Sequence, residues 1–114
     1  MRRDEASLLD IAKAGRLVVA FTRGVTKTSF LDDLKTQSAV LHQLLVIGEA
    51  VKRLSREFRA RHAAIPWPLI AGMRDHLIHA YDAVDLDEVW KTATRDVPEL
   101  LDKIEPLLPR EPEE

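Results

Sequence analysis

The sequence predicts an all-α fold, an up-and-down bundle of four main helices. Apolar residues recur at helical spacing along almost the whole chain of 114 residues. No stretch alternates apolar and polar residues as a half-buried strand would. Capping residues, a glycine and prolines separate the periodic segments. A chain of this length builds one hydrophobic core, so we expect one domain.

The first half of the chain predicts two long helices. The first covers roughly residues 4–22 and ends before Gly24. Ser29-x-x-Asp32 resembles a capping box and predicts the start of a second helix, about 30–60. Gly48 lies on the apolar stripe of that second helix, which predicts close approach of another helix there.

The second half predicts two further helices, with or without a short fifth piece around 60–66. Pro66 and Pro68 mark the start of the third helix, which we expect to end near Tyr81 or Asp82. Asp85-x-x-Glu88 is a capping box for a fourth helix, about 86–105. Pro98 lies inside this helix and predicts a kink or a break.

The bulk composition is that of an ordinary globular protein. Hydrophobic residues make up 46% and charged residues 32%, and the net charge is −2. The chain contains no cysteine, no apolar run of membrane-spanning length and no signal-peptide pattern, so we expect a cytoplasmic protein. We expect a helical domain over 1–109 and a mobile tail over 110–114.

The stretch RDHLIHAY at 74–81 contains the most informative residues of the chain. Arg74 offers a planar fork of fixed positive charge that suits a phosphate group. His79 can take up and give back a proton near neutral pH. A phosphate binder beside a proton carrier is the minimal equipment for cleaving RNA through its own 2′-hydroxyl, so Arg74 and His79 are the catalytic candidates.

The same stretch resembles the signature of the HEPN superfamily, and most closely that of the HepT-like toxins, Arg-x4-His-x-Tyr. The similarity continues in IGEAVKRLSREF at 47–58, in IPWPLIAGMRDHLIHAYDAVD at 65–85 and in the run at 89–108. It therefore covers nearly the whole chain, from residue 7 to 108.

The resemblance implies a HEPN-like bundle and a metal-independent ribonuclease toxin of a type VII-like toxin–antitoxin pair. The implied partners are RNA and a minimal nucleotidyltransferase antitoxin, in a homodimer or a larger hetero-oligomer. The antitoxin of such a pair silences the toxin by transferring AMP to the motif tyrosine, here Tyr81. A dimer also suits the chemistry, because one histidine does not easily serve as base and acid in one turnover, whereas a two-fold cleft brings two copies together.

Other residues of the sequence suggest supporting roles. Asp75 is four residues before His79 and is expected to orient its imidazole on the helix. Four basic side chains form a candidate track for the RNA backbone, with a solvated helix face as the alternative; they are Lys52, Arg53, Arg56 and Arg59. Glu49 is either a partner of Arg74 or a solvent-facing side chain. No metal or cofactor is expected, since the histidines lack ligand spacing.

A second class of function fits part of this pattern. A non-catalytic helical module could bind a nucleotide, or serve as the subunit of a nucleotidyltransferase, through the same cleft. Such a module would use Arg74 but has little use for a proton carrier at His79. A helical DNA-binding regulator is disfavoured by the acidic net charge and by the absence of a clear helix-turn-helix pair.

Overall fold

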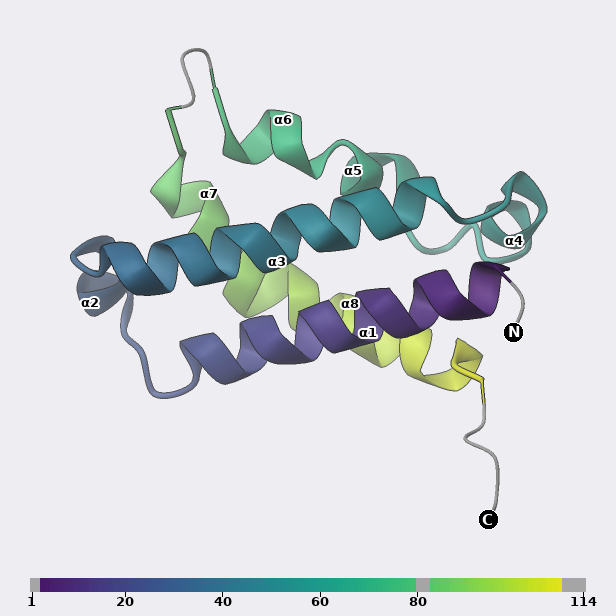
Figure 1. The fold of residues 1–114 in the computed structure, drawn as a ribbon, viewed down its shortest axis with the longest axis horizontal. Coiled ribbons are helices and arrows are strands. Elements are labelled where there is room, and N and C mark those ends of the chain that lie inside the picture. Colours follow the sequence, from purple (N-terminus) through teal and green to yellow (C-terminus); the bar gives the residue numbers. More distant parts are fainter. Residues whose placement is uncertain (1–2, 80–82, 110–114) are drawn as a thin grey trace.

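Two antiparallel helices, α1 (Arg3–Thr22) and α3 (Leu34–Lys52), form the centre of the fold (Figure 1). The computed structural model describes residues 3–79 and 83–109. In these ranges all regular structure is helical apart from one isolated antiparallel bridge, between Ile78 and Val84. The predicted all-α bundle is therefore confirmed, and its four main parts are α1, α3, the α5–α6 segment and the C-terminal segment from α7 to α8. The tail predicted over 110–114 lies outside the described residues.

The connection between α1 and α3 corrects one predicted helix start. Gly24 has a positive φ of 72°, which favours glycine and turns the chain after α1. Thr26 and Ser29 form a capping box at the start of α2 (Lys27–Leu31). The side chain of Asp33 then accepts from the backbone N–H of Thr36 and caps α3. The Ser29-x-x-Asp32 prediction was wrong because Ser29 is the third residue of a short helix and not the cap of a long one.

The helix predicted over 30–60 is divided into two. α3 ends at Lys52, and α4 (Arg56–Arg61) begins after Ser55. The Asp4 carboxylate of α1 accepts hydrogen bonds from the backbone N–H and the hydroxyl of Ser55, both at 2.7 Å. These bonds provide acceptors for the polar groups of Ser55 between the two helices. A contact from a distant part of the chain therefore stabilises a helix break that local helix propensity does not predict. The short fifth piece expected around 60–66 corresponds to α4, which begins earlier, at Arg56, and overlaps that range only at its last two residues.

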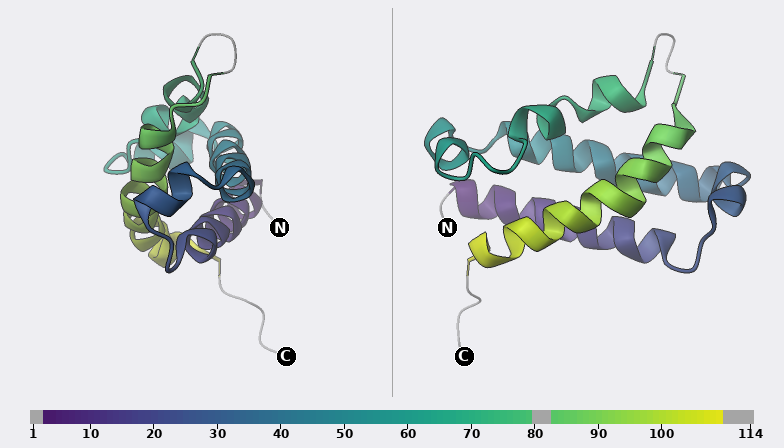
Figure 2. Two further views of the ribbon diagram at one scale, coloured as in Figure 1. Left: turned by 90° about the vertical axis from the view of Figure 1, so that its left-hand side faces the viewer. Right: turned by 180° about the vertical axis from the view of Figure 1, so that it is seen from behind.

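The third helical segment is also broken and lies along α3, on the side away from α1 (Figures 1 and 2). α5 (Trp67–Ala71) and α6 (Met73–Leu77) meet at Gly72. A Cβ built on Gly48 would stand 3.2 Å from the carbonyl oxygen of Ile70, so the absent side chain lets α5 approach the α3 backbone. The close approach predicted from Gly48 is confirmed.

The C-terminal segment crosses α1 and α3 obliquely (Figure 2). It consists of α7 (Leu86–Lys91), a π-helical turn over Thr92–Asp96, α8 (Val97–Ile104) and a short 3₁₀ turn over Glu105–Leu107. Asp85 caps α7, as predicted. Pro98 has no N–H to donate and its ring crowds the preceding turn, so the interruption it predicts appears just before it as π-helix. The backbone N–H of Val97 bonds to the carbonyl of Thr92.

The core is formed by the faces where these segments meet. Its largest fully buried side chains come from α1, α2, α3, α6 and the C-terminal segment; they are Phe30, Leu8, Ile11, Leu44, Ile47, Leu77, Ile104, Val18, Val40, Val51, Val89 and Val97. In the described part of the chain no helix is both long and apolar enough to span a bilayer. Leu77 is fully buried two residues before His79, so the core holds the end of α6 next to that histidine.

The bond between Asp4 and Ser55 generates a prediction about stability and pH. The donated backbone N–H of Ser55 lowers the pKa of Asp4 below its usual 3.8, against a smaller opposing effect of burial. A carboxyl whose folded pKa is depressed adds stability above its unfolded pKa, and this stability is lost as pH falls through the folded pKa. We expect Asp4→Asn to lower the free energy of unfolding by about 1 kcal/mol at pH 7.

Urea unfolding at pH 7 and at pH 3 measures this effect. The difference between wild type and Asp4→Asn should shrink at the lower pH, because the carboxyl of the unfolded chain then takes up a proton before the folded one does. Asp10→Asn is the matched control on the same helix, because Asp10 forms an exposed ion pair with Arg53 at 3.4 Å that adds little stability. Equal losses for the two variants would contradict the assignment.

Candidate active site

His79 lies just beyond the end of α6, on one flank of a paired loop. The backbone N–H of His79 donates to the carbonyl of Ala83, and the N–H of Asp85 donates to the carbonyl of Leu77, both at 2.8 Å. With the bridge between Ile78 and Val84, these bonds align 77–79 antiparallel to 83–85. His79 and Asp85 are diagonal neighbours in this register, on the same face of the pair.

The side chains of His79 and Asp85 use this proximity. Nε2 of His79 lies 3.2 Å from Oδ2 of Asp85. The other oxygen, Oδ1, accepts the backbone N–H of Glu88 and caps α7. The N–H of Glu88 is the main cause of the lowered pKa of Asp85, followed by the hydrogen bond with His79. Asp85 therefore stays ionised near neutral pH and connects the histidine to the start of α7.

This geometry defines the protonation pattern of the neutral imidazole. An ionised carboxylate is only an acceptor, so the ring nitrogen facing it must donate. Nε2 of His79 then carries the hydrogen and Nδ1 has the lone pair. Because 56% of the His79 side chain is exposed, a substrate can reach the ring. The arrangement supplies an oriented base of the kind found in acid–base catalysis.

The structure corrects the role expected for Asp75. That role required His79 to follow Asp75 by one helical turn, but α6 ends at Leu77 and Ile78 is already extended, with φ −123° and ψ 117°. The carboxylate that bonds His79 is Asp85. The helix that we expected to end near Tyr81 or Asp82 therefore ends several residues earlier. Tyr81 itself lies outside the described residues.

Arg74 is exposed on α6, one turn before the helix ends. Its backbone carbonyl accepts the N–H of Ile78. Among the described residues its guanidinium forms no ion pair. Glu49, which sequence reasoning left open as a partner of Arg74, is exposed and pairs with Lys52 at 3.3 Å. Arg74 can therefore offer its donors to a phosphate without first breaking a salt bridge.

The basic track predicted along the second helix is divided in two. Lys52 pairs with Glu49, and Arg53 pairs with Asp10 of α1 at 3.4 Å. Arg56 and Arg59 belong to α4 instead, and both line one hollow beside the start of α5. The break at Ser55 thus separates the ion-paired Lys52 and Arg53 from Arg56 and Arg59, which line the hollow.

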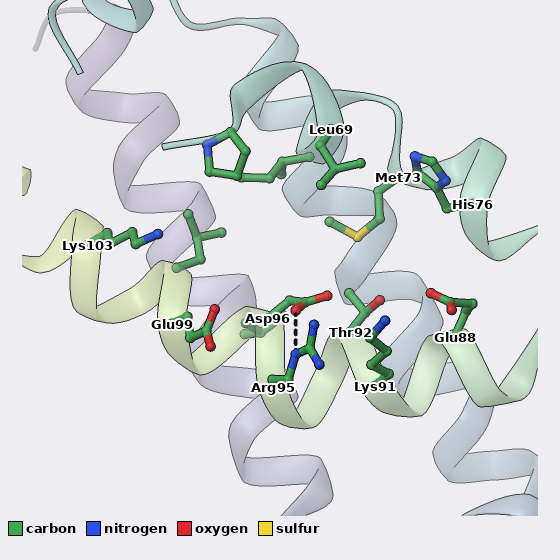
Figure 3. A pocket seen from close by; sticks show the side chains of 14 residues that line it. Leu69, Met73, His76, Glu88, Lys91, Thr92, Arg95, Asp96, Glu99 and Lys103 are labelled. Carbon is green, nitrogen blue, oxygen red and sulfur yellow. Dashed lines mark ion pairs between the residues drawn. The ribbon is translucent and has the colours of Figure 1, made fainter. Parts of the chain in front are cut away.

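A second hollow lies between α5–α6 and the C-terminal segment, with a volume of about 340 Å³. Figure 3 shows Leu69 and Met73 above it and the side chains from Glu88 to Lys103 along the other wall. Its charged lining is balanced, with as many acids as lysines and arginines: Glu88, Asp96, Glu99, Lys91, Arg95 and Lys103. His76 of the motif stretch lines this groove, whereas Arg74 and His79 do not.

Asp85 is the site residue that sequence reasoning missed. The sequence correctly predicted that Asp85 caps a helix. It did not predict that the second oxygen of the same carboxylate would contact His79. A signal was present: Asp85 follows His79 by six residues, with β-branched Ile78 and Val84 placed to pair. No group of three or more metal-ligating side chains lies together in the described ranges.

Comparison with known proteins agrees with the motif. The model of the "Ribonuclease HepT-like" family matches residues 11–107. A protein of Thermococcus cleftensis named "Probable ribonuclease HepT" is 46% identical over 94% of this chain and 98% of its own length. A "Putative RNase" of Caldanaerobacter subterraneus is 35% identical over 97% of this chain and 99% of its own. No solved structure matches the chain.

The contact between His79 and Asp85 predicts a measurable tautomer. With the ring neutral, ¹⁵N chemical shifts of His79 should show hydrogen on Nε2, because that nitrogen faces the carboxylate. Asp85→Ser retains a hydroxyl cap for α7 but is too short to orient the ring, so it should give mixed tautomers. Asp75→Ser, the matched control, should leave the spectrum unchanged. A change with Asp75→Ser and none with Asp85→Ser would reverse the assignment.

Proposed function

The chain belongs to the HepT-like ribonuclease family, and we propose that it is an endoribonuclease that cleaves RNA through the 2′-hydroxyl without a metal ion. The observation that carries the proposal is the Asp85-oriented imidazole of His79. The guanidinium of Arg74, which forms no ion pair within residues 3–79 and 83–109, lies in the same short segment. The names of the relatives, which describe ribonucleases, support the substrate class.

The proposed reaction is a transesterification at one phosphodiester. Nδ1 of His79 takes the proton of the 2′-hydroxyl, and the 2′-oxygen attacks the adjacent phosphorus. The bond from phosphorus to the 5′-oxygen breaks, and that oxygen receives a proton from an imidazolium. Arg74 stabilises the charge that develops on the non-bridging oxygens. The products are a 2′,3′-cyclic phosphate and a free 5′-hydroxyl.

A two-fold dimer would supply the second imidazole. One His79 would act as base and the partner's His79 as acid in a shared cleft. The surface beside the motif supports this assembly, since Leu69 is 57% exposed at a groove lined by as many acids as lysines and arginines. Balanced charge suits an interface in which the same patch meets itself.

We further propose that activity is controlled by a nucleotidyltransferase antitoxin encoded with the toxin. AMP transferred to Tyr81 would place a phosphate two residues from His79 in the chain. That phosphate would compete with RNA for Arg74 through charge and bulk. The proposal rests on the family signature Arg-x4-His-x-Tyr, which this chain matches at Arg74, His79 and Tyr81.

Purified protein should cut single-stranded RNA in EDTA and leave a 2′,3′-cyclic phosphate, which mass spectrometry of the fragments identifies. His79→Ala should slow cutting about 10²- to 10⁴-fold because it removes the proton carrier. Arg74→Ala should cause a comparable loss by removing charge stabilisation. Full activity of His79→Ala would refute the mechanism, and a strict requirement for Mg²⁺ would refute its metal-free form.

Two controls accompany this test. Asp75→Asn should retain wild-type activity, while Asp85→Asn should lose a substantial part of it because the ring loses its anionic partner. Mixing Arg74→Ala with His79→Ala protein should restore part of the activity if two protomers share one cleft. An active monomer at micromolar concentration would exclude the composite site.

Co-expression with the nucleotidyltransferase of the same operon should add mass in steps of one AMP, mapped to Tyr81. Tyr81→Phe retains the ring and loses the acceptor oxygen, so it should keep most of the ribonuclease activity and escape silencing. Intact-mass spectrometry and an RNA-cleavage assay measure the two effects. Equal silencing of wild type and Tyr81→Phe, without added mass, would indicate control by direct protein binding.

A further inference from the structure

The hollow beside α4 differs in charge from the groove between α5–α6 and the C-terminal segment. Its volume is about 380 Å³, and its lining comes from α4, the following loop and the start of α5. The lining residues are Arg56, Arg59, Ala60, Ala63, Ile65, Trp67 and Pro68. Two arginines and several apolar side chains therefore share this hollow, and no acidic residue is among the described residues that line it.

Arg59, one of the residues that line this hollow, has a buried hydrogen-bond donor without an acceptor in the described part of the chain. Its Nε is buried and has no hydrogen-bond partner among the described residues. A buried donor without an acceptor is unfavourable, and such groups are rare in folded proteins. The Nε and one Nη of a guanidinium form a fork that matches two oxygens of a phosphate. Rotation of this side chain toward the hollow would present that fork to an incoming anion.

Neighbouring charges leave the two arginines available. Lys52 and Arg53, just before α4, are engaged with Glu49 and Asp10. Arg56 and Arg59 appear in no ion pair of the described residues. Arg61 has its guanidinium carbon 5.9 Å from the ring centroid of Phe58 and does not line the hollow. Glu57, which lies between Arg56 and Arg59 in the sequence, is exposed and does not line the hollow.

The position of the hollow indicates which anion it would meet. α4 lies at one end of the molecule, and α6 lies further along α3, with α5 between them (Figure 1). A single RNA strand presents a phosphate at each nucleotide, so a strand that follows α5–α6 can contact both places. The apolar wall of Ala60, Ala63 and Pro68 suits the sugar or base beside such a phosphate.

We propose that Arg56 and Arg59 bind a backbone phosphate of the RNA strand several nucleotides away from the bond that is cut. This inference rests on the proposed ribonuclease function, since RNA is taken as the ligand. The α4 hollow would thus be an anchoring site that raises affinity for long RNA and does not touch the reacting atoms.

The test uses the binding of a fluorescently labelled RNA, long enough to span α5–α6, to the His79→Ala protein. Anisotropy titrations should show about tenfold weaker binding when Arg56→Ala and Arg59→Ala are added together. The slope of log K against log salt should fall by about 1.4, as expected for two lost contacts with a single strand. Arg59→Lys, which keeps the charge and loses the fork, should weaken binding by a smaller factor.

Lys52→Ala with Arg53→Ala is the matched control, because it removes the same charge from the adjacent, ion-paired residues. It should leave RNA affinity almost unchanged. Equal weakening by both double variants would overturn the proposal in favour of a general charge effect. Unchanged affinity in the Arg56/Arg59 variant would also overturn it. Circular-dichroism melts of each variant verify that the fold is retained.

Two further experiments test whether the hollow is needed only for long RNA and whether it binds free nucleotides instead. A dinucleotide contains one phosphodiester and cannot reach the cleavage site and the α4 hollow at once. The Arg56→Ala/Arg59→Ala protein with His79 intact should therefore cleave a dinucleotide as fast as wild type does. Slower dinucleotide cleavage would overturn the anchoring role. Free AMP that binds in an Arg59-dependent way, while RNA affinity is unchanged, would assign the hollow to nucleotides instead. The anisotropy arm needs no cleavage, so it tests the anchor even if the proposed catalysis fails.

Discussion

The candidate active site depends on the antiparallel pairing of residues 77–79 with 83–85. Two main-chain hydrogen bonds of 2.8 Å stop α6 at Leu77 and start α7 after Asp85. Without that pairing His79 would continue a helix, and Asp85 would have no fixed position beside it. The same carboxylate then orients His79 and caps α7, so one residue couples the site to the C-terminal segment.

The pairing is supported from within the core. Leu77 is fully buried, and Met73, one turn before it, is 7% exposed, so these two side chains anchor α6 beside its exposed arginine. Gly48 lets the α5 backbone approach α3, which places the whole segment against the centre of the fold. Burial of apolar side chains is the dominant stabilising contribution here. The buried side chains of α6 thereby hold the segment that contains Arg74 and His79 in place, while these two residues are exposed to solvent.

Much of this architecture follows from local sequence patterns. Helical periodicity predicts α1, and capping chemistry predicts Asp85 at the start of α7, because both depend on residues close in the chain. The breaks at Ser55 and Leu77 have a different cause. Ser55 is bonded by Asp4, fifty-one residues away, and Leu77 is bonded across a loop by Asp85. IHAYD contains no glycine or proline to end a helix, so propensity predicted a longer one.

The same distinction applies to the functional residues. Arg74 and His79 could be selected from residue chemistry and the family signature, whereas the partner of His79 required the loop pairing.

The proposed mechanism depends most on one role, that His79 carries protons during metal-free RNA cleavage. The pH dependence of kcat/KM in EDTA tests it most directly. A bell-shaped profile near neutral pH that disappears in His79→Ala is predicted; a rate that rises continuously with pH in both proteins would contradict it.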